Sequence, residues 1–154
     1  MTGELIAELQ QIAGEKGLLT GEAIGPRYST DARGPGGATP LFVMRPASTE
    51  EMSRMMAACH RARQPITVQG GMTGLVHAAR PQSGEAALSL ERMNAIAPVD
   101  VAGRTLTVEA GVPLQRVQEA AAAAGLLFPL DLGARGSCTI GDNLATNAGG
   151  NRVI

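Results

Sequence analysis

The chain has 154 residues, a net charge of −1 and an apolar fraction of 44%. This length and composition indicate a folded chain with a buried core, either one domain or part of a larger protein. The near-neutral charge excludes a basic field for nucleic acid or an anionic membrane, and an aromatic fraction of 2% argues against base-stacking sites. We expect Cys59 and Cys138 to be free thiols in a cytoplasmic protein, because neither a signal peptide nor an integral membrane span is visible.

The first forty residues predict one helix and then an irregular segment. Leu5, Leu9 and Ile12 recur at helical spacing and predict a helix over residues 2–13. Residues 21–40 show no periodic pattern, and their glycines and prolines indicate a segment that runs over the surface.

Strands and helices then alternate. The apolar run 41–44 predicts a buried strand, and residues 65–68 predict the next strand. Between them, Ser48 and Glu51 form a capping box that starts a helix. One face of this helix is expected to carry Met52, Met55, Met56 and Cys59. A strand, a helix and a strand in this order predict two parallel strands with a right-handed crossover.

Residues 86–90 predict a third strand, and residues 96–99 and 105–108 predict a strand pair. A last long helix is expected between Pro113 and Gly125. Its buried side should consist of Leu114, Val117 and Ala121.

The clearest chemical signal is the glycine-rich loop Gln69–Gly74, which follows a predicted strand directly. Glycines allow positive φ and close approach of backbone N–H groups to a ligand, so the loop suits a phosphate or diphosphate. The loop lacks the Gly-Lys-Ser/Thr of a nucleoside-triphosphate loop, and its spacing fits a nicotinamide Rossmann loop poorly. Alone, the loop is equally compatible with a tight turn of small residues.

A second segment, residues 130–150, is rich in small, amide and hydroxyl residues. Its apolar insertions, Ile140 and Leu144, argue against a disordered tail. The segment is expected to supply a second set of backbone donors to the same anion.

With these two segments, the chain resembles the FAD-linked oxidases and dehydrogenases of the vanillyl-alcohol oxidase (PCMH-type) superfamily. The nearest likeness is to the D-2-hydroxyglutarate, D-lactate and glycolate dehydrogenase branch. The blocks that carry the resemblance are residues 27–31, 44–51, 69–75, 108–112 and 129–150. The resemblance implies an α+β fold with a first subdomain over residues 1–125 that has a small parallel or mixed sheet flanked by helices. A second subdomain would begin at residues 126–154 and be truncated there.

The resemblance also implies which residues contact FAD. Those expected at its pyrophosphate are Gly70, Gly71, Met72, Thr73, Gly74 and Leu75. Val112 is expected near the adenine half. Those expected to line the cofactor from the other side are Pro129, Ser137, Gly141, Asn143, Thr146, Ala148 and Gly149. No catalytic residue and no metal ligand is assigned.

Two positions depart from the family pattern. Asp142 stands where the family usually has a glycine, and a carboxylate there would repel a diphosphate unless it is turned away or neutralised. His77 lies a few residues beyond the place where some members attach flavin covalently, so non-covalent FAD is expected.

The resemblance implies that the complete protein is a flavoprotein that oxidises a small 2-hydroxy acid, and that this chain alone is inactive. We expect FAD to bind the chain weakly or not at all, and an open edge to favour self-association. The alternative is a stand-alone, non-catalytic binding or interaction module that kept the scaffold and lost the flavin.

Overall fold

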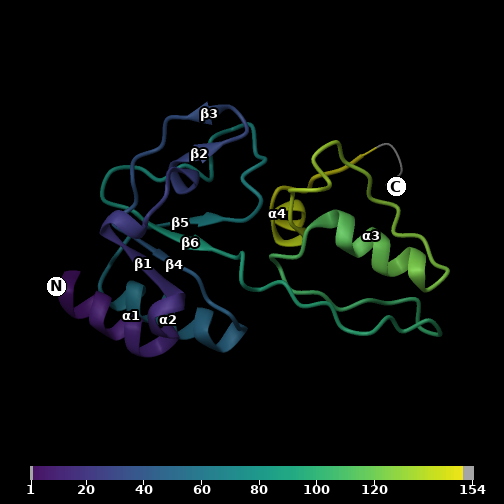
Figure 1. The fold of residues 1–154 in the computed structure, drawn as a ribbon, viewed down its shortest axis with the longest axis horizontal. Coiled ribbons are helices and arrows are strands. Elements are labelled where there is room, and N and C mark those ends of the chain that lie inside the picture. Colours follow the sequence, from purple (N-terminus) through teal and green to yellow (C-terminus); the bar gives the residue numbers. More distant parts are fainter. Residues whose placement is uncertain (1, 151–154) are drawn as a thin grey trace.

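The structure, a computed structural model, describes residues 2–150 of the chain. A sheet with two helices forms one part, and two further helices form a second part beside the end of the sheet (Figure 1). The helices are α1 (Thr2–Gly17), α2 (Thr49–Arg61), α3 (Leu114–Ala123) and α4 (Ile140–Ala145), with 3-10 turns η1 (Gly21–Ala23) and η2 (Pro26–Ser29). The strands are β1 (Leu18–Thr20), β2 (Thr30–Asp31), β3 (Gly34–Pro35), β4 (Phe42–Met44), β5 (Ile66–Gln69) and β6 (Ala86–Ser89).

The main sheet is mixed and has the strand order β1-β4-β6-β5. β4 and β5 both pair with β6 in parallel, whereas β1 pairs with β4 antiparallel. The two strands predicted to form a strand-helix-strand unit are thus parallel, as expected, but β6 lies between them. β2 and β3 form a separate two-stranded hairpin in the segment that was expected to be irregular.

Alternating side chains of the central strands pack on opposite faces of the sheet. Phe42 and Met44 pack in a core with residues of α1 and α2, which cover one face. Val43 and Ala87 point to the other face, where they pack against Tyr28 of η2. The expected flanking helices therefore both lie on one face, and a 3-10 turn covers part of the other.

The cap of α2 explains where that helix begins. The Ser48 hydroxyl accepts a hydrogen bond from the Glu51 N–H at 3.1 Å, as the capping box predicts. The Glu51 carboxylate accepts in return from the N–H of Ala47, at 2.8 Å, instead of from Ser48. The first bond satisfies a donor that the start of the helix leaves open, and the second fixes the residue that precedes the N-cap.

Two sequence expectations for this part were wrong in detail. Met55 and Cys59 are buried, but Met56 is 37% exposed and Ala58 takes its place in the core. Residues 96–99 and 105–108 do pair, but only through isolated antiparallel bridges, Ile96 with Val108 and Asp100 with Thr105.

The predicted last helix is confirmed as α3. It begins after Pro113, buries Leu114, Val117 and Ala121, and is followed by Gly125 with a φ of 73°. α3 is hydrogen-bonded to the segment that follows it, because the Gln115 N–H donates to the Arg135 carbonyl at 2.9 Å. Residues 151–154 of the expected second subdomain lie outside the described residues, and the boundary near residue 125 stays a prediction.

The burial difference between two neighbouring methionines of α2 gives a test of this packing. Met55→Ala removes a fully buried side chain and should lower the free energy of unfolding by about 2–5 kcal/mol. Met56→Ala should cost less than about 1 kcal/mol, because that side chain contacts solvent. Urea unfolding of both variants measures the difference, and equal costs would contradict the assigned helix face.

Candidate functional site

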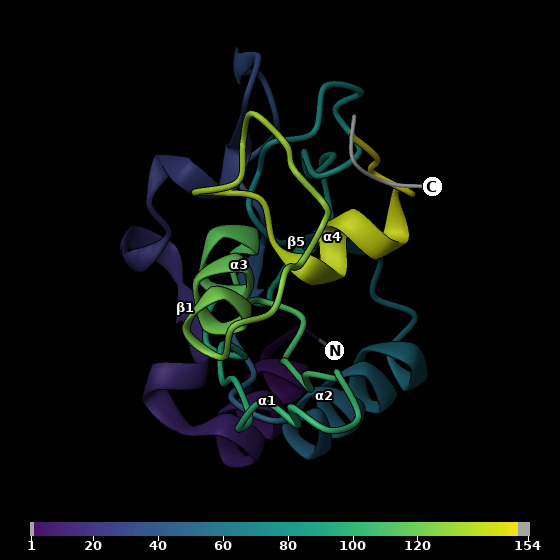
Figure 2. The same ribbon diagram turned by 90° about the vertical axis from the view of Figure 1, so that its right-hand side faces the viewer.

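The glycine loop leaves the carboxyl end of β5 and is fixed at its start by a buried glutamine. The side chain of Gln69 is 1% exposed and donates to the Tyr28 carbonyl at 2.8 Å and to the Ala79 carbonyl at 2.9 Å. These bonds tie the loop to η2 and to its own far end. α4 lies beside this end of β5 in both views (Figure 1, Figure 2).

The glycines of the loop are needed because other atoms of the chain pack directly against their Cα atoms, and not because their backbone adopts a positive φ. The left-handed residue of the loop is Met72, with a φ of 56°, and none of its glycines has a positive φ. A Cβ on Gly71 would overlap the backbone of Ser137 and Cys138, and one on Gly70 would overlap the Asp142 carboxylate. The expectation of positive φ at the glycines was therefore wrong. Gly70 and Gly71 allow close approach of the chain's own backbone and of Asp142, and their close approach to a ligand stays a prediction.

The middle of the loop offers unused backbone donors. Within residues 2–150, no hydrogen bond uses the N–H groups of Met72, Thr73, Gly74 or Leu75. Consecutive free N–H groups form the kind of concavity that binds phosphate oxygens. The loop therefore has the donors that an anion requires.

Most of the backbone donors predicted in the second segment are used within the chain itself, although Gly149 has no N–H hydrogen bond within residues 2–150. The Gly141 N–H donates to the Ala110 carbonyl at 2.8 Å, and the Asn143 N–H donates to Thr139 at 3.0 Å. The N–H groups of three more predicted site residues are used in the same way: Ser137, Thr146 and Ala148. These bonds fold α4 and its flanks against the loop, so this segment can reach a ligand mainly through side chains and carbonyl groups.

Asp142 occupies one donor of the glycine loop. Its Oδ2 accepts a hydrogen bond from the Gly71 N–H at 2.6 Å. The departure from the family pattern at this position thus brings a carboxylate directly onto the loop, instead of turning it away.

A cavity of about 290 Å³ opens between the loop and α3. Of the predicted site residues, Gly70, Gly71 and Ser137 line it, while Val112 is fully buried in the core. The remaining lining residues were not predicted as site residues: Arg27, Glu91, Asn94, Gly111, Pro113, Arg116 and Thr139. The Thr139 hydroxyl is buried and has no hydrogen-bond partner among the described residues, so it is available to a ligand.

Glu91 is the acidic residue among those that line the cavity, and two arginines neutralise its carboxylate. Arg27 contacts it at 2.5 Å and Arg45 at 2.6 Å, and the Tyr28 hydroxyl donates to it at 2.9 Å. Burial raises the pKa of Tyr28, and the hydrogen bond to Glu91 and its charge raise it further. A signal in the sequence could have found Glu91, because it follows β6 at the same sheet edge as the glycine loop.

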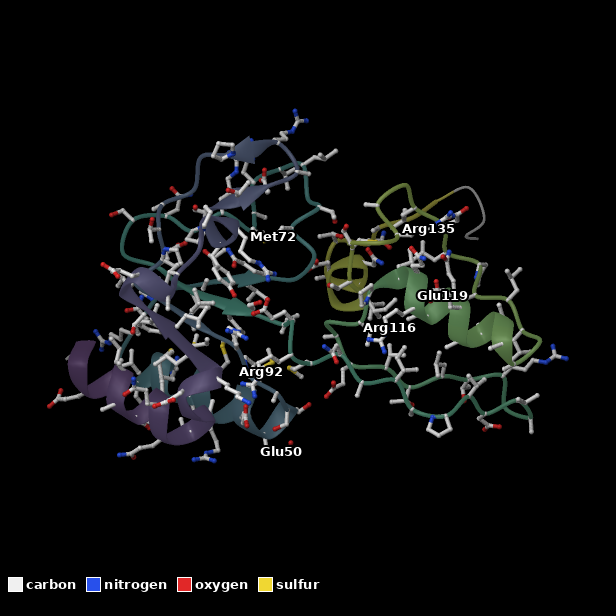
Figure 3. The ribbon with its side chains drawn as sticks, viewed as in Figure 1. Glu50, Met72, Arg92, Arg116, Glu119 and Arg135 are labelled. Carbon is white, nitrogen blue, oxygen red and sulfur yellow. The ribbon has the colours of Figure 1, made fainter. Side chains whose placement is uncertain are left out.

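Arg116 is the cation of the lining that has no carboxylate partner within residues 2–150. Its guanidinium donates to the Asn94 carbonyl at 3.1 Å. Arg116 lies at the end of α3 that faces the sheet, and Met72 lies across the junction from it (Figure 3). The cavity therefore holds one cation that an anionic ligand can use.

The stretch that follows the glycine loop, residues 77–80, is fixed by a buried carboxylate. Asp31 accepts hydrogen bonds from Arg80 at 2.7 Å and from the His77 Nδ1 at 2.9 Å. Burial would raise the pKa of Asp31, but the bonds from His77, the Arg33 N–H and Arg80 outweigh it and hold the pKa at about 2. His77 is thus an anchor of the loop to the β2–β3 hairpin.

Within residues 2–150, no group of three or more His, Cys, Asp or Glu side chains could hold a metal ion. No helix in the described part of the chain is long and apolar enough to cross a membrane.

Close approach at the glycine loop can be tested with two alanine substitutions. Gly71→Ala should lower the free energy of unfolding by about 1–3 kcal/mol, because its Cβ would collide with backbone atoms that cannot rotate away. Gly74→Ala is the matched control: no atom lies within 4 Å of its Cβ position, so stability should stay constant or rise by up to about 1 kcal/mol. A Gly71→Ala variant as stable as the control would contradict the packing of the loop on Ser137.

The anchor at Asp31 predicts a defined pH dependence. The pKa of Asp31 falls from 3.8 to about 2 on folding, so the ionised group stabilises the fold above pH 3.8 and this contribution disappears as the pH falls through 2. The difference in unfolding free energy between the wild type and Asp31→Asn should therefore shrink from about pH 4 to about pH 2. Urea unfolding over this range measures it, and a difference that stays constant would refute the assignment.

Comparisons with known proteins agree with this geometry. Residues 40–154 match the family described as "FAD binding domain". The chain is 42% identical over 154 residues to a D-2-hydroxyglutarate dehydrogenase from Xanthomonas citri pv. viticola, covering 100% of this chain and 33% of that protein. It is 36% identical to an uncharacterized FAD-linked oxidoreductase from Mycobacterium tuberculosis, covering 98% of this chain and 33% of that protein. The chain thus spans about a third of the length of these relatives.

Solved structures share the fold. An alkyldihydroxyacetonephosphate synthase superposes with a TM-score of 0.86 at 22% identity, covering 96% of this chain and 30% of that chain. A p-cresol methylhydroxylase with bound substrate gives a TM-score of 0.68 at 19% identity, covering 85% of this chain and 26% of that chain. The chain therefore belongs to the FAD binding domain family and has the α+β PCMH-type fold that the sequence implied, and this family membership supports FAD as the cofactor.

Proposed function

We propose that the chain is the N-terminal FAD-binding part of a flavin-dependent oxidoreductase that oxidises a small 2-hydroxy acid. The observation that supports this best is the row of unused N–H groups from Met72 to Leu75, which directly follows Gly70 and Gly71 in the lining of the cavity. The identity to a protein named D-2-hydroxyglutarate dehydrogenase supports the substrate class, with D-lactate and glycolate as the other candidates.

The residues present fit the diphosphate of FAD, with Asp142 as the exception. The free N–H groups of residues 72–75 would hold phosphate oxygens, and Arg116 would supply a positive charge. The unpartnered hydroxyl of Thr139 would donate from the opposite side of the cavity. The other predicted contacts, from Val112 and from residues 129–149, remain part of the proposal.

When bound, FAD would supply a two-electron oxidation in which the hydride leaves the carbon that bears the substrate hydroxyl and the hydroxyl proton is lost to a base or to solvent, giving a 2-oxo acid. The described residues bind and orient the cofactor in this proposal, and we assign none of them to the chemical step.

A second candidate function, a binding module without flavin, draws support from Asp142. Its carboxylate already satisfies the Gly71 N–H, so the loop has a partner without any ligand. The two functions differ in a simple property, because only the first requires that FAD bind to the loop.

Titration with FAD, followed by flavin fluorescence, tests the first proposal on the chain itself. We expect weak binding, with a Kd above about 1 μM, because the chain spans about a third of its relatives and supplies only part of the contacts. Arg116→Ala should raise the Kd about tenfold through loss of a charge-assisted contact. The control, Arg135→Ala, removes an exposed arginine that pairs with Asp131 outside the cavity lining and should leave the Kd unchanged.

The enzymatic part of the proposal needs the complete reading frame that contains these residues. Its purified product should show flavin absorbance and should reduce a dye when given D-2-hydroxyglutarate, D-lactate or glycolate. A colourless product that is indifferent to FAD would reject this proposal and favour the module without flavin.

Two further expectations remain proposals. The buried free thiols of Cys59 and Cys138 support a cytoplasmic location, although relatives from rice are named as mitochondrial. Self-association is supported by exposed apolar side chains directly after the loop, Leu75 and Val76, and on α4, Leu144.

A further inference from the structure

We infer that Asp142 is an internal anion that occupies a phosphate-binding donor of the glycine loop and competes with FAD for it. This inference rests on the proposed binding of FAD at the loop. It goes further in assigning to one side chain of this chain the control of cofactor affinity.

The contact is close and directed. The Gly71 N–H donates to Asp142 Oδ2 at 2.6 Å, which is short for a bond from a backbone amide to a carboxylate. The same carboxylate covers the Cα of Gly70, where a Cβ would overlap all of its three atoms. The carboxylate therefore blocks the face of the loop at two consecutive glycines.

Hydrogen bonds hold the backbone of Asp142 in place, so the fold fixes the position from which its side chain reaches Gly71. The Asp142 carbonyl accepts from the Thr146 N–H at 3.0 Å and from the Thr146 hydroxyl at 2.7 Å. The preceding Gly141 packs against Ala110, where a Cβ would contact the Ala110 carbonyl at 2.9 Å. α4 thus has little freedom to withdraw, and a ligand must displace the side chain alone.

The charge of Asp142 is not neutralised within residues 2–150. The other two buried or cavity-lining carboxylates each have an arginine: Asp31 pairs with Arg80, and Glu91 pairs with Arg27 and Arg45. No ion pair of the described residues includes Asp142.

A diphosphate at the loop meets two obstacles from this side chain. The Gly71 N–H has one hydrogen and already donates it, and a second anion within a few ångströms is repelled. Both obstacles disappear in Asp142→Ala, in which a methyl group is the whole side chain. Removal of the Asp142 carboxylate should therefore strengthen the binding of FAD. In the free chain it removes the hydrogen bond from the Gly71 N–H.

Two substitutions of Asp142 separate the effect of its charge on FAD binding from the effect of its shape. Asp142→Ala removes both the acceptor and the charge without the backbone freedom of a glycine, and Asp142→Asn keeps the shape and removes the charge. We expect FAD to bind Asp142→Ala at least about tenfold more tightly than the wild type, equivalent to about 1.4 kcal/mol, with Asp142→Asn in between. The matched control is Glu119→Gln, which removes one negative charge from the exposed side of α3 and should leave the Kd within about twofold.

A second measurement does not depend on FAD. In amide NMR spectra of the free chain, the Gly71 amide proton should move upfield in Asp142→Ala and stay in place in Glu119→Gln, because only the first loses its acceptor. The Asp142→Ala chain should also unfold at slightly lower urea concentration, so that affinity and stability change in opposite directions. A purely structural role for Asp142 would lower both.

The outcomes distinguish this inference from the proposed function. Equal FAD affinity of the wild type and Asp142→Ala, or an unmoved Gly71 resonance, overturns the inference and leaves FAD binding intact. If no variant binds FAD even though the Gly71 resonance moves, the competition is overturned, whereas the proposed function is decided by the flavin absorbance of the complete product. Tighter binding by Asp142→Ala with an unchanged Glu119→Gln supports both.

Discussion

The contact between the Gly71 backbone and the Ser137–Cys138 backbone joins the two parts of this chain. A second contact of the same kind holds Gly111 against the carbonyls of Leu90 and Met93. Both contacts need the absence of a side chain, and both lie at the carboxyl ends of parallel strands, where sheets of this type bind ligands. The cavity borders on both contacts, because Gly71, Gly111 and Ser137 are among the residues that line it.

The contact of Gly71 with Ser137 and Cys138 also bears on which backbone N–H groups stay unused in each of the two segments. The segment that packs on Gly71 uses many of its own N–H groups to build α4 and its flanks, whereas four consecutive N–H groups stay unused at residues 72–75. Two segments that looked equivalent as donor-rich sequences thus have different roles. The glycine loop presents consecutive backbone donors, and the segment 130–150 presents the acidic side chain of Asp142 and a backbone that packs against the loop.

Local sequence patterns predicted the elements whose stability is local or whose apolar pattern is strong. α2, α3 and the strands β4, β5 and β6 all carry such patterns, from the Ser48 cap to the buried run at β6. β1 was missed because three residues become a strand only by pairing with β4. The glycine loop was found from its spacing, but the contact between Asp142 and Gly71 joins residues 71 positions apart and depends on the packing of the whole second part.

The anchors of the glycine loop have a kinetic consequence. Gln69 holds one end to Tyr28 and Ala79, and Asp31 holds the other end through His77 and Arg80. The conformational entropy of the loop is therefore lost when the chain folds, and little ordering remains for the encounter with a ligand. For a pre-organised site of this kind, differences in affinity appear mainly as differences in how long the ligand stays.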